Sequence, residues 1–186
     1  DSGIVPMALA LEEAGYTRFP GSRQQNTSLL APMKEQPMRQ QGRYAMITGS
    51  KEYSPDNKDE LGVLTSYDNR YGEKIQVVLI SRAGAEGLDF KNIRQIHILE
   101  PWYNLSRIEQ VIGRGVRNLS HCSLPFEERN VEIYMHATET EAGVPTADTH
   151  LYELALKKAK QIGNVTRMMK ETSVDCILNH EQTNFT

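Results

Sequence analysis

The sequence has 186 residues, enough for one main domain with its own core, and its net charge of −3 excludes the basic character common in small DNA-binding modules. Any contact with nucleic acid must therefore be local. Hydrophobic residues make up 39%, and no apolar run approaches a membrane span, so we expect a soluble protein without a membrane partner. The two cysteines, Cys122 and Cys176, form no Cys-x-x-Cys pair, which indicates a reducing compartment.

The N-terminal part is predicted to hold one helix and one irregular insertion. The chain begins at Asp1 without an initiator Met or a signal core, and we interpret it as a fragment of a longer protein. Apolar spacing predicts a helix over residues 2–16 with Ser2 as its N-cap. Residues 19–42 carry three of the eight prolines and no apolar period, which predicts a mobile surface insertion.

Strands and helices are then predicted to alternate. Apolar runs predict strands at residues 43–48, 75–81, 93–99 and 131–136, and spacing and capping predict helices at residues 54–67, 104–116 and 148–170. The run Ile75–Ser81 is typical of a strand buried on both faces of a parallel sheet. The alternation predicts an α/β domain with a mostly parallel sheet flanked by helices. We expect residues 1–140 to form this domain and residues 141–186 a C-terminal helical extension.

Two segments carry the strongest functional signal. Residues 81–90 read Ser-Arg-Ala-Gly-Ala-Glu-Gly-Leu-Asp-Phe, and residues 110–117 read Gln-Val-Ile-Gly-Arg-Gly-Val-Arg. The first begins where a predicted strand ends, at the carboxyl edge of the sheet, where α/β folds bind ligands. In the second, Arg114 and Arg117 share a helix face, and their planar guanidinium groups suit the charge that develops on a γ-phosphate.

Each segment alone has a simpler explanation. The arginines would fit a solvated face that pairs with Glu100 or Glu109, and the first segment would fit a glycine-rich turn capped by Asp89. However, Gly113 and Gly115 each cost about 1 kcal/mol inside a helix, which indicates a close approach by another surface. We therefore interpret the two segments together as one site.

In order and spacing, the two segments resemble motifs V and VI of superfamily 2 helicases and translocases. Other segments resemble the helicases of large nucleocytoplasmic DNA viruses, the group that includes the poxvirus early transcription factor small subunit and nucleoside triphosphate phosphohydrolase I. They are Glu100-Pro-Trp-Tyr-Asn104, Ser120-His121, Leu124-Pro125, Glu128-Arg-Asn130 and Val174-Asp-Cys-Ile-Leu-Asn179. The resemblance covers most of the chain, with residues 19–42 outside it.

The resemblance implies the second, C-terminal RecA-like lobe of a P-loop NTPase-type fold, with its first strand missing here. It also implies roles for several residues: Arg114 and Arg117 as arginine fingers, Gln110 in coupling the nucleotide to the interlobe cleft, and Gly87 and Asp89 beside the ribose. ATP and Mg²⁺ would be bound mainly by an absent N-terminal lobe, because this sequence has no G-x-x-x-x-G-K-[ST] phosphate loop. We expect the fragment alone to be inactive.

Nucleic-acid contacts are predicted where two strands end. Ser81 offers a hydroxyl to a backbone phosphate, and Thr48 and Gly49 offer a hydroxyl and a backbone N–H. An ordinary strand-to-loop turn explains Thr48 and Gly49 equally well. Trp102 and Tyr103 either stack on a base or pack structurally, and the second explanation is the more common.

We predict no metal site. His121-Cys122 and Cys176-x-x-x-His180 supply zinc-type ligands, but the spacing of the first pair does not fit common zinc modules. Scattered structural cysteines and surface histidines explain them better.

The leading functional hypothesis is the C-terminal lobe of an ATP-dependent helicase or DNA translocase, with the DNA or RNA backbone and the N-terminal lobe as partners. Two alternatives stay open: a nucleoside triphosphatase that serves the viral transcription machinery without unwinding, and a degenerate structural or docking domain. The viral resemblance implies a location in the cytoplasm or the virion.

Overall fold

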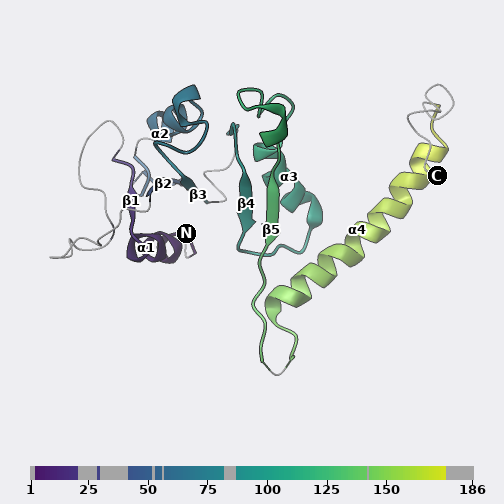
Figure 1. Cartoon of the computed structure of the whole chain (residues 1–186). Coiled ribbons are helices and arrows are strands. Elements are labelled where there is room, and N and C mark those ends of the chain that lie inside the picture. The colour runs from purple at the N-terminus through teal and green to yellow at the C-terminus, as the bar shows by residue number, and fades with distance from the viewer. Residues whose placement is uncertain are drawn as a thin grey trace. The chain divides into compact units, whose positions relative to one another are not determined.

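The computed structural model describes residues 3–20, 29, 42–51, 53–55, 57–81, 87–141 and 143–174. The chain forms two compact units that alternate along the sequence. The first unit comprises Asp1–Arg94 and Arg114–Val131, and the second comprises Gln95–Gly113 and Glu132–Thr186. Each unit combines parallel strands with helices (Figure 1), so the predicted α/β class is confirmed.

The first unit contains a three-stranded parallel sheet. Its strands are β1 (Tyr16–Arg18), β2 (Gly42–Ile47) and β3 (Val77–Ile80), in the order β1-β2-β3. Tyr16 lies opposite Gly42, and Tyr44 lies opposite Val77. The sequence prediction missed β1, because three residues carry too little periodicity and this strand depends on pairing with β2.

Helices cover both faces of this sheet. Helix α1 (Ile4–Glu13) packs on β1 and β3, and helix α2 (Asn57–Leu64) packs on β2. Side chains of β2 alternate between the two faces. Tyr44 and Met46 belong to the cluster that includes Ala8 of α1, whereas Ala45 and Ile47 belong to the cluster that includes Leu64 of α2. The core of the first unit is therefore built around β2.

The strand that is buried on both faces is β2, and not the segment predicted from the run Ile75–Ser81. Residues Tyr44–Ile47 are at most 1% exposed, whereas β3 is half-buried and Ile80 is 37% exposed. The prediction failed because β3 lies at the edge of the three-stranded sheet, which apolar composition cannot reveal.

A buried polar pair links α1 to β2. The Tyr44 hydroxyl donates a hydrogen bond of 2.6 Å to the Glu12 carboxylate, which also accepts one of 3.0 Å from the backbone N–H of Leu29. Burial and the hydrogen bond to Glu12 raise the pKa of Tyr44. Glu12 is only 8% exposed, so its carboxylate requires hydrogen-bond donors such as these.

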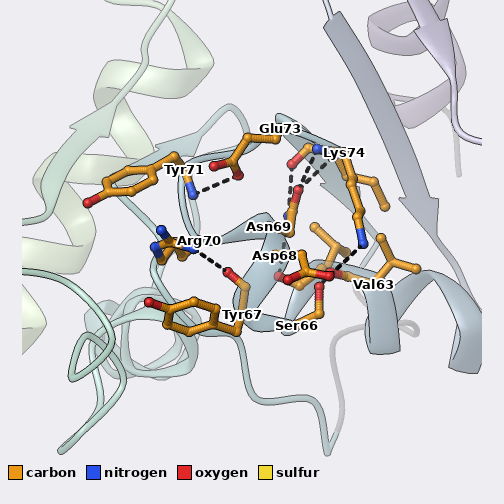
Figure 2. A network of polar contacts seen from close by, with 11 residues as sticks. Val63, Ser66, Tyr67, Asp68, Asn69, Arg70, Tyr71, Glu73 and Lys74 are labelled. Atoms are coloured by element: carbon orange, nitrogen blue, oxygen red, sulfur yellow. Dashed lines mark hydrogen bonds and ion pairs between the residues drawn. The ribbon is translucent and has the colours of Figure 1, made fainter.

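A buried asparagine organises the chain between α2 and β3, as Figure 2 shows. The Asn69 side-chain oxygen accepts hydrogen bonds from the backbone N–H groups of Lys74 and Ile75, at 2.9 and 2.8 Å. Its amide donates to the backbone oxygens of Leu64 and Ile75, at 3.4 and 3.1 Å. Asn69 therefore fixes the path of the chain into β3 and hence towards Ser81.

The second unit contains a two-stranded parallel sheet and two helices. Strand β4 (Gln95–Ile98) pairs with β5 (Glu132–Met135), and Gln95 lies opposite Glu132. Helix α3 (Leu105–Gly115) begins in this unit and its last two residues belong to the first. Helix α4 (Ala147–Glu171) is a single long helix (Figure 1) that begins with a capping box between Thr146 and Thr149.

Most predicted elements are present. Besides the missed strand β1, there are four differences. Helix α1 begins after Gly3, which makes no side-chain cap bond, rather than after Ser2. The helix predicted at 54–67 is shorter, since α2 ends at Leu64 and a 3₁₀ turn, η2, covers Tyr67–Asn69. A further 3₁₀ turn, η3, covers Phe126–Glu128. The strands form two sheets among the described residues, rather than one.

The insertion predicted at 19–42 mostly lies outside the described residues. Its two edges do not belong to an insertion, because the Phe19 N–H donates to the Tyr44 oxygen at 2.8 Å and Gly42 begins β2. The boundary between residues 140 and 141 stays a prediction. Within the part of the chain that is described, no helix combines the length and apolar character needed to cross a bilayer.

Candidate functional site

The end of the first predicted motif lies alongside the end of the second. The Phe90 N–H donates to the Arg114 oxygen at 3.2 Å, and the Asn92 N–H donates to the Ser120 oxygen at 3.0 Å. A ring nitrogen of His121 lies 2.8 Å from the Ile93 oxygen. These backbone contacts lie within the first unit and hold residues 88–93 beside residues 114–121.

This junction brings four of the predicted site residues together. Arg114 Nη1 donates a hydrogen bond of 3.2 Å to the backbone oxygen of Leu88. Leu88 lies between Gly87 and Asp89 in the sequence. Arg117 Nη1 lies 2.6 Å from Asp89 Oδ1. Two guanidinium groups and one carboxylate therefore gather at one place, which is a suitable arrangement for binding an anion beside a sugar hydroxyl.

Ser120 holds the backbone of Arg117, a role that the sequence prediction missed. Ser120 is 7% exposed, and its hydroxyl donates to the Arg117 oxygen at 2.8 Å and accepts from the Arg117 N–H at 3.3 Å. It also lies 2.7 Å from His121 Nδ1. Arg117 lies two residues beyond the end of α3 at Gly115, so the prediction that Arg114 and Arg117 share a helix face is wrong. The signal available in the sequence is a serine three residues after an arginine that follows a helix, a spacing that permits a serine turn.

Gly87 adopts a backbone conformation that favours glycine. Its φ of +75° lies in the left-handed region, and an added Cβ would meet no atom within 4 Å among the described residues. The glycine is thus required by the backbone angle rather than by packing. Residues 82–86, which include Gly84, lie outside the described residues.

The predicted nucleic-acid residues lie where β2 and β3 end side by side. The Ser81 N–H donates to the Ile47 oxygen at 3.0 Å, which extends the pairing of the two strands. Thr48 is 1% exposed, and its hydroxyl donates to the Ser50 oxygen and accepts from the Ser50 N–H, at 3.1 and 3.2 Å. This geometry favours the explanation of Thr48 as part of an ordinary strand-to-loop turn. Gly49, in contrast, is exposed.

Gln110 lies on the part of α3 that belongs to the second unit, and its side chain is exposed. Gly113 follows on the same helix. An added Cβ at Gly113 would meet nothing within 4 Å in the described part of the chain. The surface predicted to approach Gly113 is therefore not supplied by these residues.

The aromatic pair lies beside two cations of the second unit. The Trp102 and Tyr103 rings are 4.9 Å apart. The Arg107 guanidinium lies 4.3 Å from the Trp102 centroid, and Lys158 Nζ lies 4.6 Å from the Tyr103 centroid. Trp102 is half-buried and Tyr103 is 43% exposed, so these cation–π contacts support the structural explanation for the pair.

The zinc alternative gains no support from the described residues. Both ring nitrogens of His121 lie within hydrogen-bond distance of protein atoms, those of Ser120 and Ile93. Cys122 is exposed, while Cys176 and His180 lie outside the described residues. Within the described ranges, no three His, Cys, Asp or Glu residues form a group that could hold a metal ion.

Comparison with known proteins gives related sequences over the whole chain. A protein of Invertebrate iridescent virus 3 named as a helicase (087L) is 32% identical over 189 residues, which cover all of this chain and 18% of that protein. One of Acanthamoeba polyphaga mimivirus, named as an ATP-dependent RNA helicase (R350), is 37% identical over 68% of this chain and 17% of its own length. The termination factor NPH-I homolog of African swine fever virus is 33% identical over 75% of this chain and 21% of its own.

This chain therefore spans a fifth or less of two of these relatives and 21% of the third. The match to the iridescent virus protein includes residues 19–42, so the expectation that they lie outside the resemblance is wrong. The sequence model of one family, the helicase conserved C-terminal domain, matches residues 26–118. That range is half of the chain and includes both motifs. The chain accordingly belongs to the helicase conserved C-terminal domain family.

Proposed function

We propose that this chain is the second lobe of an ATP-driven nucleic-acid motor and that Arg114 and Arg117 act as its arginine fingers. The observation that carries the proposal is the junction at which Arg114 contacts Leu88 and Arg117 contacts Asp89. At this junction the two arginines of the second motif lie beside Leu88 and Asp89 of the first. The chain belongs to a family of helicase domains, in which such arginines suit a nucleotide phosphate.

The residues present fit part of an ATP site. The two guanidinium groups suit the phosphates, and the Asp89 carboxylate, with a side chain that is 59% exposed, suits a ribose hydroxyl next to Gly87. The phosphate loop and the Mg²⁺ ligands are assigned to an N-terminal lobe outside this chain. ATP supplies the phosphoanhydride bond whose hydrolysis drives the motor.

The arginines contribute chiefly when charge develops on the transferred phosphoryl group. A guanidinium aimed at this charge lowers the barrier more than it stabilises the bound ground state. Gln110, in the second unit, is assigned to coupling between nucleotide and interlobe cleft. Ser81 and Gly49, at the ends of β3 and β2, are assigned to the nucleic-acid backbone, and Thr48 to the shape of that turn.

The test is single-turnover ATP hydrolysis by the full-length protein with Arg117→Ala and Arg117→Lys. Arginine fingers account for roughly 10³ to 10⁵ in rate, so Arg117→Ala should nearly abolish hydrolysis while ATP affinity changes little. Arg117→Lys should restore little, because an ammonium lacks the forked geometry. Hydrolysis by folded Arg117→Ala within a few-fold of the wild-type rate would refute the assignment.

A second candidate is a nucleoside triphosphatase that acts in transcription without unwinding. It is favoured by the relative named as a termination factor, which matches 75% of this chain. Strand displacement on a tailed duplex separates the two, because a transcription nucleoside triphosphatase would hydrolyse ATP in the presence of DNA without releasing the strand. If the full-length protein neither hydrolyses ATP nor moves, the docking-domain alternative holds.

A further inference from the structure

A groove in the second unit lies apart from the junction of the two motifs. It has a volume of about 370 Å³ and runs between the start of α3, at Asn104–Glu109, and the C-terminal half of α4. On the α4 side its lining combines the apolar Ala159 and Ile162 with Gly163, Thr166, Arg167 and Lys170. All of these residues belong to the same compact unit.

The groove lies on the most basic part of the chain. Residues 157–170 include five Lys and Arg residues and no Asp or Glu, although the whole chain has a net charge of −3. Of these five, Arg167 and Lys170 line the groove, and they share a face because they are three apart on a helix. The positive charge is therefore concentrated, and part of it faces a concave surface.

Arg167 can exchange its present partner for another anion. Its Nε lies 2.8 Å from Glu171 Oε1, and the two side chains are 61% and 52% exposed. An ion pair this exposed contributes little to stability, so a phosphate can compete with Glu171 for Arg167. Among the described residues that line the groove, one is acidic, Glu109 on α3, and it opposes an anionic occupant.

Gly163 gives a second reason to expect an occupant. A glycine inside a helix is less favourable than an alanine at the same position. An added Cβ at Gly163 would meet nothing within 4 Å among the described residues, so packing within this part of the chain does not require the glycine. A groove floor of bare helix backbone instead permits another molecule to approach closely.

We propose that this groove binds the phosphodiester backbone of a nucleic-acid strand, with Arg167 and Lys170 as phosphate contacts. The proposal rests on the proposed function, in which the full-length protein moves along nucleic acid. Arg167 supplies a fork of donors, Lys170 a point charge and Thr166 a hydroxyl, which are the groups that contact backbone phosphates. A concave surface of this kind suits a strand better than it suits the flat surface of an anionic membrane.

The decisive measurement is the affinity of the 186-residue chain for a labelled single-stranded oligonucleotide, followed by fluorescence anisotropy at several salt concentrations. Replacing both groove cations, Arg167→Gln with Lys170→Gln, should weaken binding by about 10-fold and reduce the slope of log affinity against log salt by about 1.4, at 0.7 per lost phosphate contact. The matched control is Lys157→Gln with Lys160→Gln. It removes the same charge from the same helix outside the groove lining and should leave the slope nearly unchanged.

Two further variants test the groove itself. Glu109→Gln should tighten binding by about 2-fold, since it removes the opposing charge. Gly163→Ala should raise the melting temperature, because alanine favours the helix, and yet weaken binding by obstructing the close approach. If the variant is more stable and yet binds the oligonucleotide more weakly, misfolding is not the cause of the weaker binding.

Several results would overturn the proposal. The first is that the wild-type chain does not bind the oligonucleotide. The second is that the groove and control double variants lose the same affinity, and the third is that the groove variant binds as tightly as the wild type. Loss of binding to phosphatidylserine vesicles but not to the oligonucleotide would assign the groove to a membrane instead. The groove variants leave Arg114 and Arg117 in place, so their effect on oligonucleotide binding tests the groove alone. The arginine-finger assignment is tested separately, by ATP hydrolysis.

Discussion

Arg117 Nη1 lies 2.6 Å from Asp89 Oδ1, and this ion pair connects the two motifs through side chains that are 49% and 59% exposed. A pair this exposed contributes at most about 1 kcal/mol, so Arg117 can leave Asp89 when another anion arrives. The ion pair keeps Arg117 beside the proposed nucleotide position, but Asp89 does not hold Arg117 tightly.

Asp89→Asn should separate the two proposed roles of this carboxylate. Because the pair with Arg117 is exposed, the free energy of unfolding should change by less than about 1 kcal/mol. If Asp89 also contacts the ribose, the full-length variant should bind ATP more weakly and should no longer distinguish ATP from its 2′-deoxy and 3′-deoxy analogues. Nucleotide titrations of the wild type and the variant measure this, and an unchanged preference between these nucleotides would remove Asp89 from the ribose site.

Ser120→Ala should lower kcat of the full-length protein more than it raises KM, because Ser120 is a positioning residue for Arg117. The loss of the buried hydroxyl should also cost about 1–3 kcal/mol of stability. Ser120→Thr keeps a hydroxyl and should restore part of the rate. Ser66→Ala is a suitable control, since its hydroxyl donates to the Val63 oxygen at 2.7 Å within the same unit. If both alanine variants lower kcat equally, Ser120 has only a structural role.

Gly87→Ala should destabilise the chain by about 1–2 kcal/mol, because a side chain at positive φ is strained even though its Cβ has open space. Gly62→Ala is the matched control. Gly62 lies in α2, and its added Cβ also meets nothing within 4 Å in the described chain, so the change should stabilise by about 0.5–1 kcal/mol. Urea unfolding of both variants compares them, and equal effects would contradict the strain argument.

Tyr44→Phe should destabilise the chain by about 1–3 kcal/mol, because the buried Glu12 carboxylate loses a donor. The pH dependence follows from the raised pKa of Tyr44. The folded chain holds the tyrosine proton more tightly than the unfolded chain, so this contribution is complete below about pH 10 and is lost as the pH rises further. The difference between wild type and variant, measured by urea unfolding at several pH values, should therefore shrink above about pH 10. A difference that stays constant to higher pH would show that Tyr44 ionises equally in both states.

The sequence predicted the elements that have their own periodicity. Helix α4 and strands β4 and β5 follow from local spacing, and they lie within two residues of the predicted positions. Strand β1 was missed, and β2 rather than β3 proved to be the buried strand, because both facts depend on which strands become neighbours in the sheet.

The candidate site shows the same division. The residue types and their spacing singled out Arg114 and Arg117, since those properties can be read along the chain, whereas the role of Asp89 was implied by the resemblance to superfamily 2 helicases. The role of Ser120 could not be predicted, because it depends on a turn that returns its hydroxyl to the Arg117 backbone. Likewise, the burial of Thr48 follows from its hydrogen bond to Ser54, whose hydroxyl accepts from the Thr48 N–H at 2.9 Å.

The parallel arrangement of the strands has a consequence for the speed of folding. In the first unit Tyr16 meets Gly42 and Tyr44 meets Val77, and in the second Gln95 meets Glu132. None of these pairings can start from a tight hairpin, so each requires the closure of a long loop before any ladder hydrogen bond forms. Refolding of the chain should therefore be slow for its size, with the three-residue strand β1 the last to gain protection from hydrogen exchange.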